Sequence, residues 1–163
     1  MAVYLVRHGE TDWNIEKRFQ GQRDIPLNER GLAQARASGQ ALSGLRFGAI
    51  FASPLHRACR TAEIIAGYTG GAPVVTDPLL IERSFGALEG MTLPQGQAYL
   101  AAHGGTGGQE SKLSAGGRMA RFLEKAAVQY PDEDILVVSH GSIICCTLSL
   151  ITGDRLALSG YDI

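Results

Sequence analysis

The amino-acid sequence has no excess of charge of either sign. It contains 15 lysine and arginine residues against 16 aspartate and glutamate residues, which gives a formal net charge of −1 at pH 7. Proteins that hold nucleic acid or an anionic membrane through their overall field need a net positive charge. We therefore expect no nucleic-acid partner and no membrane partner. Any site for an anion must be built locally.

The sequence also lacks a long hydrophobic run near its start. The first apolar run, residues 2–6, stops at Arg7. This run is too short for a signal peptide or for a membrane span. We expect a cytoplasmic protein.

Cysteine is scarce, and its three positions are Cys59, Cys145 and Cys146. Two of them are adjacent, and none stands in a Cys-x-x-Cys or Cys/His spacing that could hold a metal ion. We interpret the three cysteines as small core residues and expect no metal site.

Glycine, in contrast, is abundant. The 21 glycines among 163 residues are roughly 13% of the chain, about twice the usual share. Glycine serves where the backbone needs a positive φ or a close approach, so the positions of the glycines carry information. The length and the 45% apolar content fit one globular domain spanning residues 1–163.

Short runs typical of β-strands alternate with helical patterns, as in an α/β fold. The runs are Val3–Val6, Ala49–Ala52, Pro73–Thr76 and Ile135–Ser139. The apolar spacing predicts helices over residues 29–43, over 54–66, from Met119 to before Pro131, and over 142–151. We therefore expect a three-layer α/β/α fold with a mostly parallel central sheet.

Local signals add detail to this fold. Ser53 suits the N-cap of the second helix, and Pro54 suits its first position. The helix from Ser142 is apolar almost all round and should be buried. Residues 91–117 are rich in glycine, so we expect a mobile lid segment with one short helix near Leu93 to Ala102.

Polar side chains follow each predicted strand, where ligands gather in open α/β sheets. Arg7 and His8 follow the first strand, and Arg57 lies one helical turn beyond the second. Glu82 comes shortly after the third strand, and His140 directly follows the fourth. These five side chains are expected to meet at one edge of the sheet.

This set of residue types suits a phosphoryl group. Two arginine side chains can bind a phosphate bidentately, one neutral imidazole offers a nucleophilic nitrogen, and the other can donate a hydrogen bond to the same oxygens. The N–H groups of Gly141 and Ser142, at a helix start, can bind an anion. A carboxyl group with a raised pKa, that of Glu82, can protonate the leaving oxygen. No metal ion is required, because the arginines supply the positive charge.

Four motifs in the sequence match those of one family. Residues 7–14, Arg-His-Gly-Glu-Thr-Asp-Trp-Asn, are followed by Gln20-Gly21, Pro26-Leu27 and Gly31-x-x-Gln34-Ala35. Residues 53–62 read Ser-Pro-Leu-x-Arg-Ala-x-x-Thr-Ala, residues 82–90 read Glu-x-x-x-Gly-x-x-Glu-Gly, and residues 139–141 read Ser-His-Gly. In this order and spacing, the sequence resembles the histidine phosphatase superfamily, also called phosphoglycerate mutase-like, from about residue 3 to 153.

The resemblance implies a role for each matching residue. His8 would be the nucleophile that becomes phosphohistidine, and Glu82 would be the proton donor and later the base for water. The phosphate pocket would consist of Arg7, Arg57 and His140. The substrate side of the pocket would be formed by Asn14, Gln20, Gly21, Arg83 and Gly141.

The family includes both phosphatases and mutases, and the shared pocket does not separate them. The segment 91–117 carries only Lys112 as a basic residue other than His103, which leaves little charge to bind the second end of a bisphosphate. We therefore favour metal-independent hydrolysis of a small-molecule phosphomonoester, without a cofactor. A cofactor-dependent phosphoglycerate mutase, which would use 2,3-bisphosphoglycerate, is the alternative, because residues 82–90 resemble the mutase form of the motif. A non-catalytic phosphate-binding regulatory module is a third interpretation.

Two further features of the resemblance concern the lid and the chain end. Gly108-Gln109-Glu110-Ser111 is a modified form of a Gly-Glu-Ser turn that precedes the next helix in many phosphatase members. Family members usually continue past the last buried helix to a further strand, so either Leu156–Ile163 serves as that strand or the strand is absent. A short, weakly basic lid and a short end both favour a small phosphatase.

Overall fold

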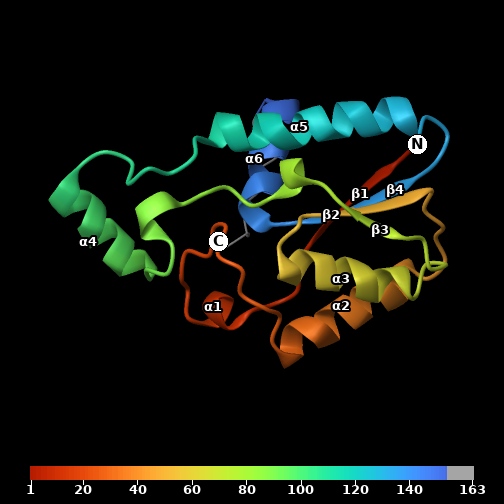
Figure 1. The fold of residues 1–163 in the computed structure, drawn as a ribbon, viewed down its shortest axis with the longest axis horizontal. Helices are drawn as coiled ribbons and strands as arrows, with labels where there is room; N and C mark the ends of the chain where they lie inside the picture. Colours follow the sequence, from red (N-terminus) through yellow and green to blue (C-terminus); the bar gives the residue numbers. More distant parts are fainter. Residues whose placement is uncertain (154–163) are drawn as a thin grey trace.

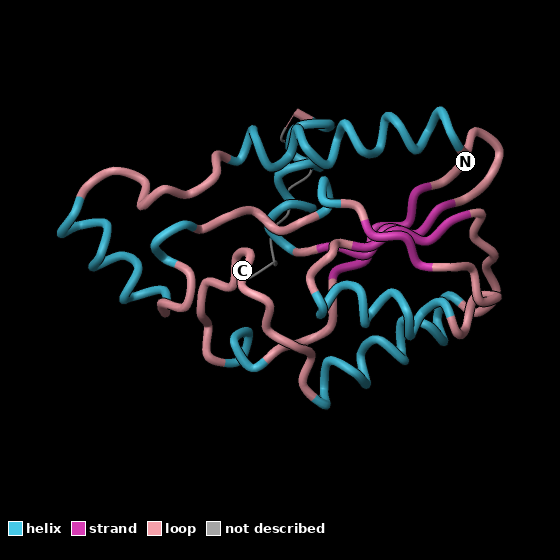
Figure 2. Tube along the Cα trace, viewed as in Figure 1, coloured by secondary structure: helices cyan, strands magenta, loops and turns pink. Residues whose placement is uncertain are grey.

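A four-stranded parallel sheet forms the centre of the molecule in a computed structural model that describes residues 1–153 (Figures 1 and 2). The strands are β1 (Val3–Arg7), β2 (Ala49–Ala52), β3 (Val74–Thr76) and β4 (Ile135–Ser139), in the spatial order β1-β4-β2-β3. All three pairings are parallel. The four strands predicted from the sequence are confirmed, with β1 one residue longer and β3 one residue shorter than expected.

Helices cover both faces of the sheet (Figure 1). One face carries α2 (Glu29–Leu42) and α3 (His56–Ala66), and the other carries α5 (Lys112–Gln129) and α6 (Gly141–Thr152). The other helical elements are α1 (Asp12–Ile15), α4 (Leu93–His103), and the 3₁₀ turns η1 (Pro78–Leu80) and η2 (Gly86–Leu88). The helix α4 lies at one end of the molecule, away from the sheet (Figure 1). The α/β/α architecture with a parallel sheet is confirmed.

Residues of the strand β4 pack into two hydrophobic cores, one on each face of the sheet. Side chains alternate across a strand, so successive residues face opposite layers. Ile135 and Val137 pack with Phe122 of α5, whereas Leu136 and Val138 pack with the layer of α3. All five residues of β4 are buried. Its unbroken apolar run is therefore the signature of a strand covered on both faces.

The helix α3 begins later than the sequence signals indicated. The predicted N-cap Ser53 and first helical residue Pro54 both precede the helix, whose N-cap is Leu55 without a side-chain hydrogen bond. The Ser53 hydroxyl instead accepts a hydrogen bond from the Leu55 N–H at 3.3 Å and lies 2.7 Å from Nε2 of His140. The prediction was wrong because the Ser53 hydroxyl pairs with His140, which follows β4, and the helix itself starts at His56.

The glycine-rich region is more ordered in its secondary structure than its composition indicated. The expected short helix is present as α4, which ends at Gly104. The helix α5 begins at Lys112, where the Ser111 hydroxyl accepts from the Ser114 N–H at 3.0 Å. Residues 112–117 are thus the first turns of α5. The predicted final strand, Leu156–Ile163, lies outside the described residues.

Candidate active site

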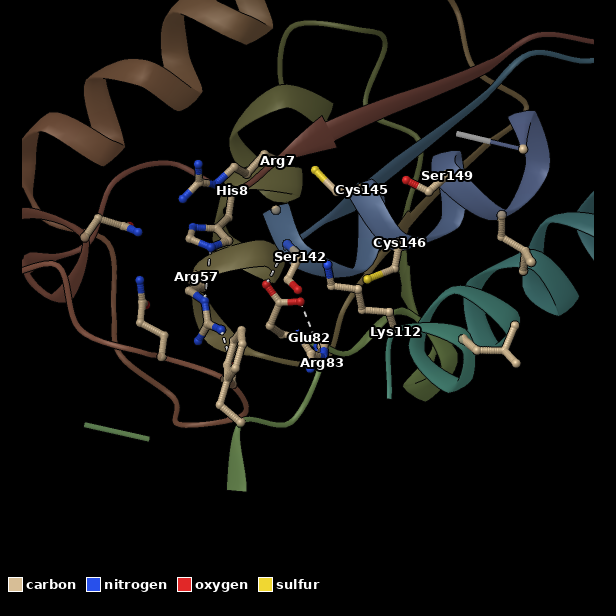
Figure 3. Close-up of a pocket in the computed structure, with 18 residues that line it drawn as sticks. Arg7, His8, Arg57, Glu82, Arg83, Lys112, Ser142, Cys145, Cys146 and Ser149 are labelled. Carbon is tan, nitrogen blue, oxygen red and sulfur yellow. Dashed lines mark hydrogen bonds between the residues drawn. The ribbon is translucent and has the colours of Figure 1, made fainter. Parts of the chain in front are cut away.

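A cavity of about 660 Å³ opens at the carboxyl ends of the strands (Figure 3). Its walls come from the end of β1, from α1 and the loop after it, from α3, from the loop after η1, from the first turn of α5 and from the whole length of α6. The residues that form its walls are Arg7, His8, Asn14, Gln20, Gly21, Arg57, Glu82, Arg83, Phe85, Lys112, Leu113, Gly141, Ser142, Cys145, Cys146, Ser149, Leu150 and Gly153. Four of the five candidate catalytic residues therefore meet in one cavity, as do all the candidate substrate residues.

His8 lies directly after β1 and is buried. Its Nδ1 lies 2.6 Å from the carbonyl oxygen of Gly9. Because a carbonyl oxygen only accepts, Nδ1 carries the proton, and in the neutral ring Nε2 keeps its lone pair. Burial, followed by the positive charge of Arg57, lowers the pKa of His8 to about 3. The imidazole is therefore neutral at pH 7, with a nucleophilic nitrogen.

Arg57 extends from the first turn of α3 and is fully buried. Its Nε donates to Nε2 of His8 at 3.3 Å, and its terminal nitrogens donate to the carbonyl oxygens of Arg23 at 2.6 Å and Gly21 at 2.8 Å. Burial lowers the pKa of Arg57 to about 10, and the carboxyl group of Glu82 opposes this shift. The side chain is thus a fixed cation at neutral pH beside the nucleophilic nitrogen of His8.

Arg7 ends β1 and is exposed at the cavity wall. Its side chain passes close to the start of α6, where a Cβ placed on Gly141 would lie 3.3 Å from Nε of Arg7. A glycine at position 141 therefore gives the second guanidinium group room at the cavity.

Glu82 is buried, and its carboxylate accepts three backbone hydrogen bonds. The donors are the N–H groups of Arg83 at 2.7 Å, Ile143 at 2.9 Å and Ser142 at 3.1 Å. Burial raises the pKa of Glu82, and these three hydrogen bonds oppose the rise. The N–H of Ser142 was predicted to bind an anion, but it donates to the Glu82 carboxyl group. The first N–H groups of α6 are thus already occupied by the Glu82 carboxyl group.

His140 lies beside His8 but is not part of the cavity wall. Its ring is fully buried and meets the His8 ring edge to face, with the ring centres 5.1 Å apart. Burial, with Arg57 next in effect, lowers the pKa of His140 well below its usual value. Its Nε2 is bonded to the Ser53 hydroxyl, and its Nδ1 has no partner among the described residues. The ring is thus a neutral support for the nucleophile.

The candidate substrate residues differ in how firmly they are held. The Asn14 side chain accepts from the backbone N–H of Thr11 at 3.0 Å, within a capping box of α1. Gln20 is buried, and its Oε1 has no partner among the described residues. The Arg83 side chain donates from Nε to the Glu110 carbonyl oxygen at 2.7 Å. Asn14 and Arg83 are therefore anchored, whereas the Gln20 oxygen is open to a donor.

Several residues of the cavity wall were not predicted from the sequence. Cys145 and Cys146 are only partly buried and line the cavity. Cys146 also packs against the hydrophobic core, so the interpretation as a core residue was wrong for Cys145. Burial raises the pKa of both thiols. On the same helix Leu150 and Ile151 are exposed, so α6 is not buried all round as predicted. The apolar composition of α6 hid this difference, because small apolar residues fit a cavity wall as well as a core.

Two findings concern metal ions and membranes. Among residues 1–153, no group of three or more histidine, cysteine, aspartate or glutamate side chains is placed to hold a metal ion. No helix within the same range is long and apolar enough to cross a membrane. The cationic groups of the cavity wall belong to Arg7, Arg57, Arg83 and Lys112.

The fold is α/β, and its cavity places four cationic side chains around a neutral, buried histidine. The chain belongs to the histidine phosphatase superfamily (branch 1), whose family model matches residues 3–159. Members of this superfamily are enzymes named as phosphatases and as phosphoglycerate mutases. The architecture is phosphoglycerate mutase-like, as its solved neighbours show.

Individual relatives carry both kinds of name. The chain is 40% identical to a Bacillus subtilis protein named uncharacterized phosphatase PhoE, over 93% of this chain and 78% of that protein. It is 37% identical to a probable phosphoglycerate mutase GpmB from Serratia proteamaculans, over 94% and 75% of the two chains. A solved mycobacterial glucosyl-3-phosphoglycerate phosphatase in complex with VO3 is 30% identical, with a TM-score of 0.81 over 90% of this chain and 78% of that one.

Proposed function

We propose that the protein hydrolyses a small-molecule phosphomonoester through a phosphohistidine intermediate on His8, without a metal ion. One observation carries this proposal: the unprotonated Nε2 of a neutral, buried His8 lies 3.3 Å from the Nε of a buried Arg57, in a cavity that also contains the Glu82 carboxyl group. The nucleophile His8, the cation Arg57 and the proton carrier Glu82 thus lie in the same cavity. Such positioning and charge stabilisation are the main requirements of phosphoryl transfer.

In the first step, the lone pair of His8 Nε2 attacks the phosphorus of the substrate. The bond from phosphorus to the leaving oxygen breaks, and the protonated carboxyl group of Glu82 gives its proton to that oxygen. The Gly9 carbonyl, bonded to Nδ1–H at 2.6 Å, stabilises the positive charge that develops on the ring. Arg7 and Arg57 stabilise the phosphoryl oxygens.

In the second step, a water molecule attacks the phosphorus of phosphohistidine. The Glu82 carboxylate takes a proton from this water, and the bond from phosphorus to Nε2 breaks. Inorganic phosphate leaves, His8 is neutral again, and Glu82 is protonated again. One alcohol and one phosphate are thus formed from one phosphomonoester and one water, with no other reactant.

Mutase activity is the second candidate, and the relatives named phosphoglycerate mutase favour it. The structure supplies an argument against it. Residues 91–111, which run from the end of η2 to the start of α5, contain no lysine or arginine. Lys112 belongs to α5 and reaches the cavity from there. This segment would therefore bring no lysine or arginine to the second phosphate of a bisphosphate, and we favour hydrolysis.

A labelling experiment tests the intermediate. The protein is incubated with a radiolabelled phosphomonoester, quenched, and analysed for acid-labile phosphate on His8. We expect label on the wild-type protein, none on a His8→Ala variant, and accumulated label on a Glu82→Gln variant given an aryl phosphate. Absence of label and of free phosphate for a folded wild-type protein would overturn the proposal and favour a non-catalytic phosphate-binding module.

A second experiment separates hydrolysis from mutase activity. The protein is given 3-phosphoglycerate with and without 2,3-bisphosphoglycerate, and the products are quantified. Hydrolysis predicts free phosphate in both reactions. Rapid formation of 2-phosphoglycerate with little free phosphate, only when the bisphosphate is present, would establish the mutase instead.

A further inference from the structure

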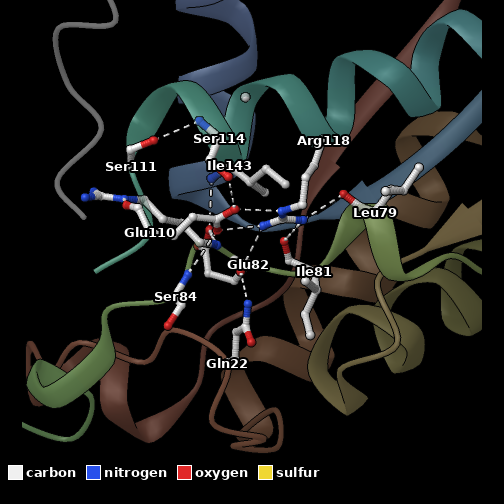
Figure 4. Close-up of polar contacts among 12 residues, drawn as sticks. Gln22, Leu79, Ile81, Glu82, Ser84, Glu110, Ser111, Ser114, Arg118 and Ile143 are labelled. Carbon is white, nitrogen blue, oxygen red and sulfur yellow. Dashed lines mark hydrogen bonds and ion pairs between the residues drawn. The ribbon is translucent and has the colours of Figure 1, made fainter. Parts of the chain in front are cut away.

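One ion pair lies next to the segment that carries Glu82 but outside the cavity wall. Glu110, just before α5, pairs with Arg118 of α5 through Nε at 2.8 Å and through a terminal nitrogen at 2.9 Å (Figure 4). Each of the two side chains is only 16% exposed. A bidentate pair that is largely shielded from water is stronger and better defined than a surface ion pair.

The same guanidinium group also binds the backbone that leads to Glu82. Arg118 donates to the carbonyl oxygens of Leu79 at 2.9 Å, Ile81 at 3.1 Å and Glu82 at 3.4 Å. Arginine alone among side chains offers enough donors in one plane to serve a carboxylate and several carbonyls together. Arg118 thus fixes the chain from η1 up to Glu82.

Glu110 binds the backbone that leaves Glu82 on the other side. Its carboxylate accepts from the Ser84 N–H at 3.4 Å, and its own N–H donates to the Ser84 carbonyl oxygen at 2.9 Å. Its carbonyl oxygen accepts from the Arg83 side chain at 2.7 Å. Ser114 of α5 donates to the Glu110 carboxylate at 2.9 Å and orients it. Glu82 therefore lies between two stretches of backbone that are held by one ion pair.

We propose that Glu110 and Arg118 are positioning residues that fix the backbone on both sides of Glu82 and so hold its carboxyl group where proton transfer takes place. This inference rests on the proposed function, in which Glu82 is the acid and the base. Neither residue lines the cavity, so neither touches the substrate. Their effect on the reaction has to pass through the placement of Glu82.

A comparison of leaving groups detects this effect. The first step with an alkyl phosphate, such as glycerol phosphate, needs a proton for the leaving oxygen, whereas p-nitrophenyl phosphate releases a stable anion. A well-placed general acid contributes about 10²-fold to 10⁴-fold to such a step. We expect Arg118→Met to lower kcat/KM about tenfold or more for the alkyl phosphate, and less than about threefold for the aryl phosphate.

Two conservative variants, Arg118→Lys and Glu110→Gln, test the same effect with less risk of unfolding the protein. Arg118→Lys keeps the charge but cannot serve Glu110 and the three carbonyls together, and Glu110→Gln keeps the shape but removes the charge. Both should shift the ratio of alkyl to aryl kcat/KM in the same direction as Arg118→Met. Glu63→Gln is the matched control, because it breaks the exposed pair of Arg60 and Glu63 on α3. That variant should leave the ratio unchanged.

A variant of Glu82 tests whether Arg118 changes the ratio of alkyl to aryl kcat/KM through Glu82. In a Glu82→Gln background the proton carrier is already absent, so Arg118→Lys should no longer change the ratio of alkyl to aryl kcat/KM. A merely structural role would lower both activities equally and would persist in that background.

The outcomes separate the two proposals. If the wild-type protein hydrolyses the aryl phosphate but the ratio is the same in Arg118→Lys and Glu110→Gln, the positioning role is wrong and the proposed function stands. If the ratio changes equally with and without Glu82, the positioning role is also wrong. If the wild-type protein hydrolyses neither phosphate and forms no phosphohistidine, both proposals fail together.

Discussion

Two adjacent glycines of α5 should respond in opposite directions to the same substitution. A Cβ placed on Gly116 would lie 2.7 Å from the carbonyl oxygen of Cys146 and 2.9 Å from its carbonyl carbon, both in α6. A Cβ placed on Gly117 meets no atom within 4 Å. Both residues have helical neighbours on either side, so alanine removes the same backbone freedom from the unfolded chain at both positions.

The expected magnitudes follow from these contacts. Replacing glycine by alanine inside a helix stabilises it by about 1 kcal/mol, which is the full effect expected for Gly117→Ala. Gly116→Ala gains the same amount, but α5 and α6 must move apart because the contact is with backbone atoms. Overpacking of this kind costs about 3 kcal/mol at the upper end of its range, which leaves a net loss of about 2 kcal/mol.

Thermal unfolding followed by circular dichroism compares the Tm of both variants with that of the wild-type protein. For a chain of this length we expect Tm to rise by about 2–4 °C in Gly117→Ala and to fall by about 4–8 °C in Gly116→Ala. Gly117→Ala is the internal control for helix propensity. Equal stabilisation by both substitutions would refute the close approach of α5 and α6 at Gly116.

Further predictions concern the reaction and its pH dependence. His8→Ala should abolish turnover with an unchanged circular dichroism spectrum; residual turnover above about a thousandth of the wild-type rate would contradict a nucleophilic role for His8. A chelator should leave the activity unchanged in a steady-state assay, and a chelator-sensitive rate would contradict the metal-free scheme. Orthovanadate, which resembles five-coordinate phosphorus, should inhibit competitively, and no inhibition at millimolar levels would count against the pocket. Burial lowers the pKa of His8 from 6.5 to about 3. Between pH 6.5 and about 3, His8 is therefore protonated in the unfolded chain but not in the folded chain. The free energy of unfolding should therefore fall as the pH drops from 6.5 to about 3, and His8 should account for up to about 5 kcal/mol of this fall. The fall should be smaller in the His8→Asn variant, which lacks this titrating group. Identical pH profiles for the two proteins would show that His8 is not buried in a neutral form.

The sheet was predictable because its strands are short apolar runs between helical patterns. The run of β4 shows this most clearly, since all its residues are buried between two helical layers. The start of α3 was not predictable from local signals. Ser53 and Pro54 form a good helix start by propensity, but the Ser53 hydroxyl is used by His140, which lies 87 residues further along the chain. Tertiary contacts of this kind leave no local pattern.

The gathering of the site was predictable from topology, because parallel strands place their carboxyl ends at one edge of the sheet. Arg7, His8, Arg57 and Glu82 all reach the cavity in this way. The binding of Glu82 to the start of α6 was not predictable, since it joins segments 60 residues apart. The part of the cavity wall formed by α6, including Cys145, was not predictable, because the apolar composition of α6 also fits a core helix.

The pairing of β1 with β4 has a consequence for folding. Val3 lies opposite Ile135, and the His8 N–H donates to the Ser139 carbonyl oxygen at 3.0 Å. The strand that precedes His8 therefore has its sheet partner more than 130 residues away. Contacts of such long sequence separation form slowly, because the loop between them must close first. During synthesis, the first strand emerges from the ribosome long before its partner, so its hydrogen-bonding groups stay unpaired for most of the time that translation takes.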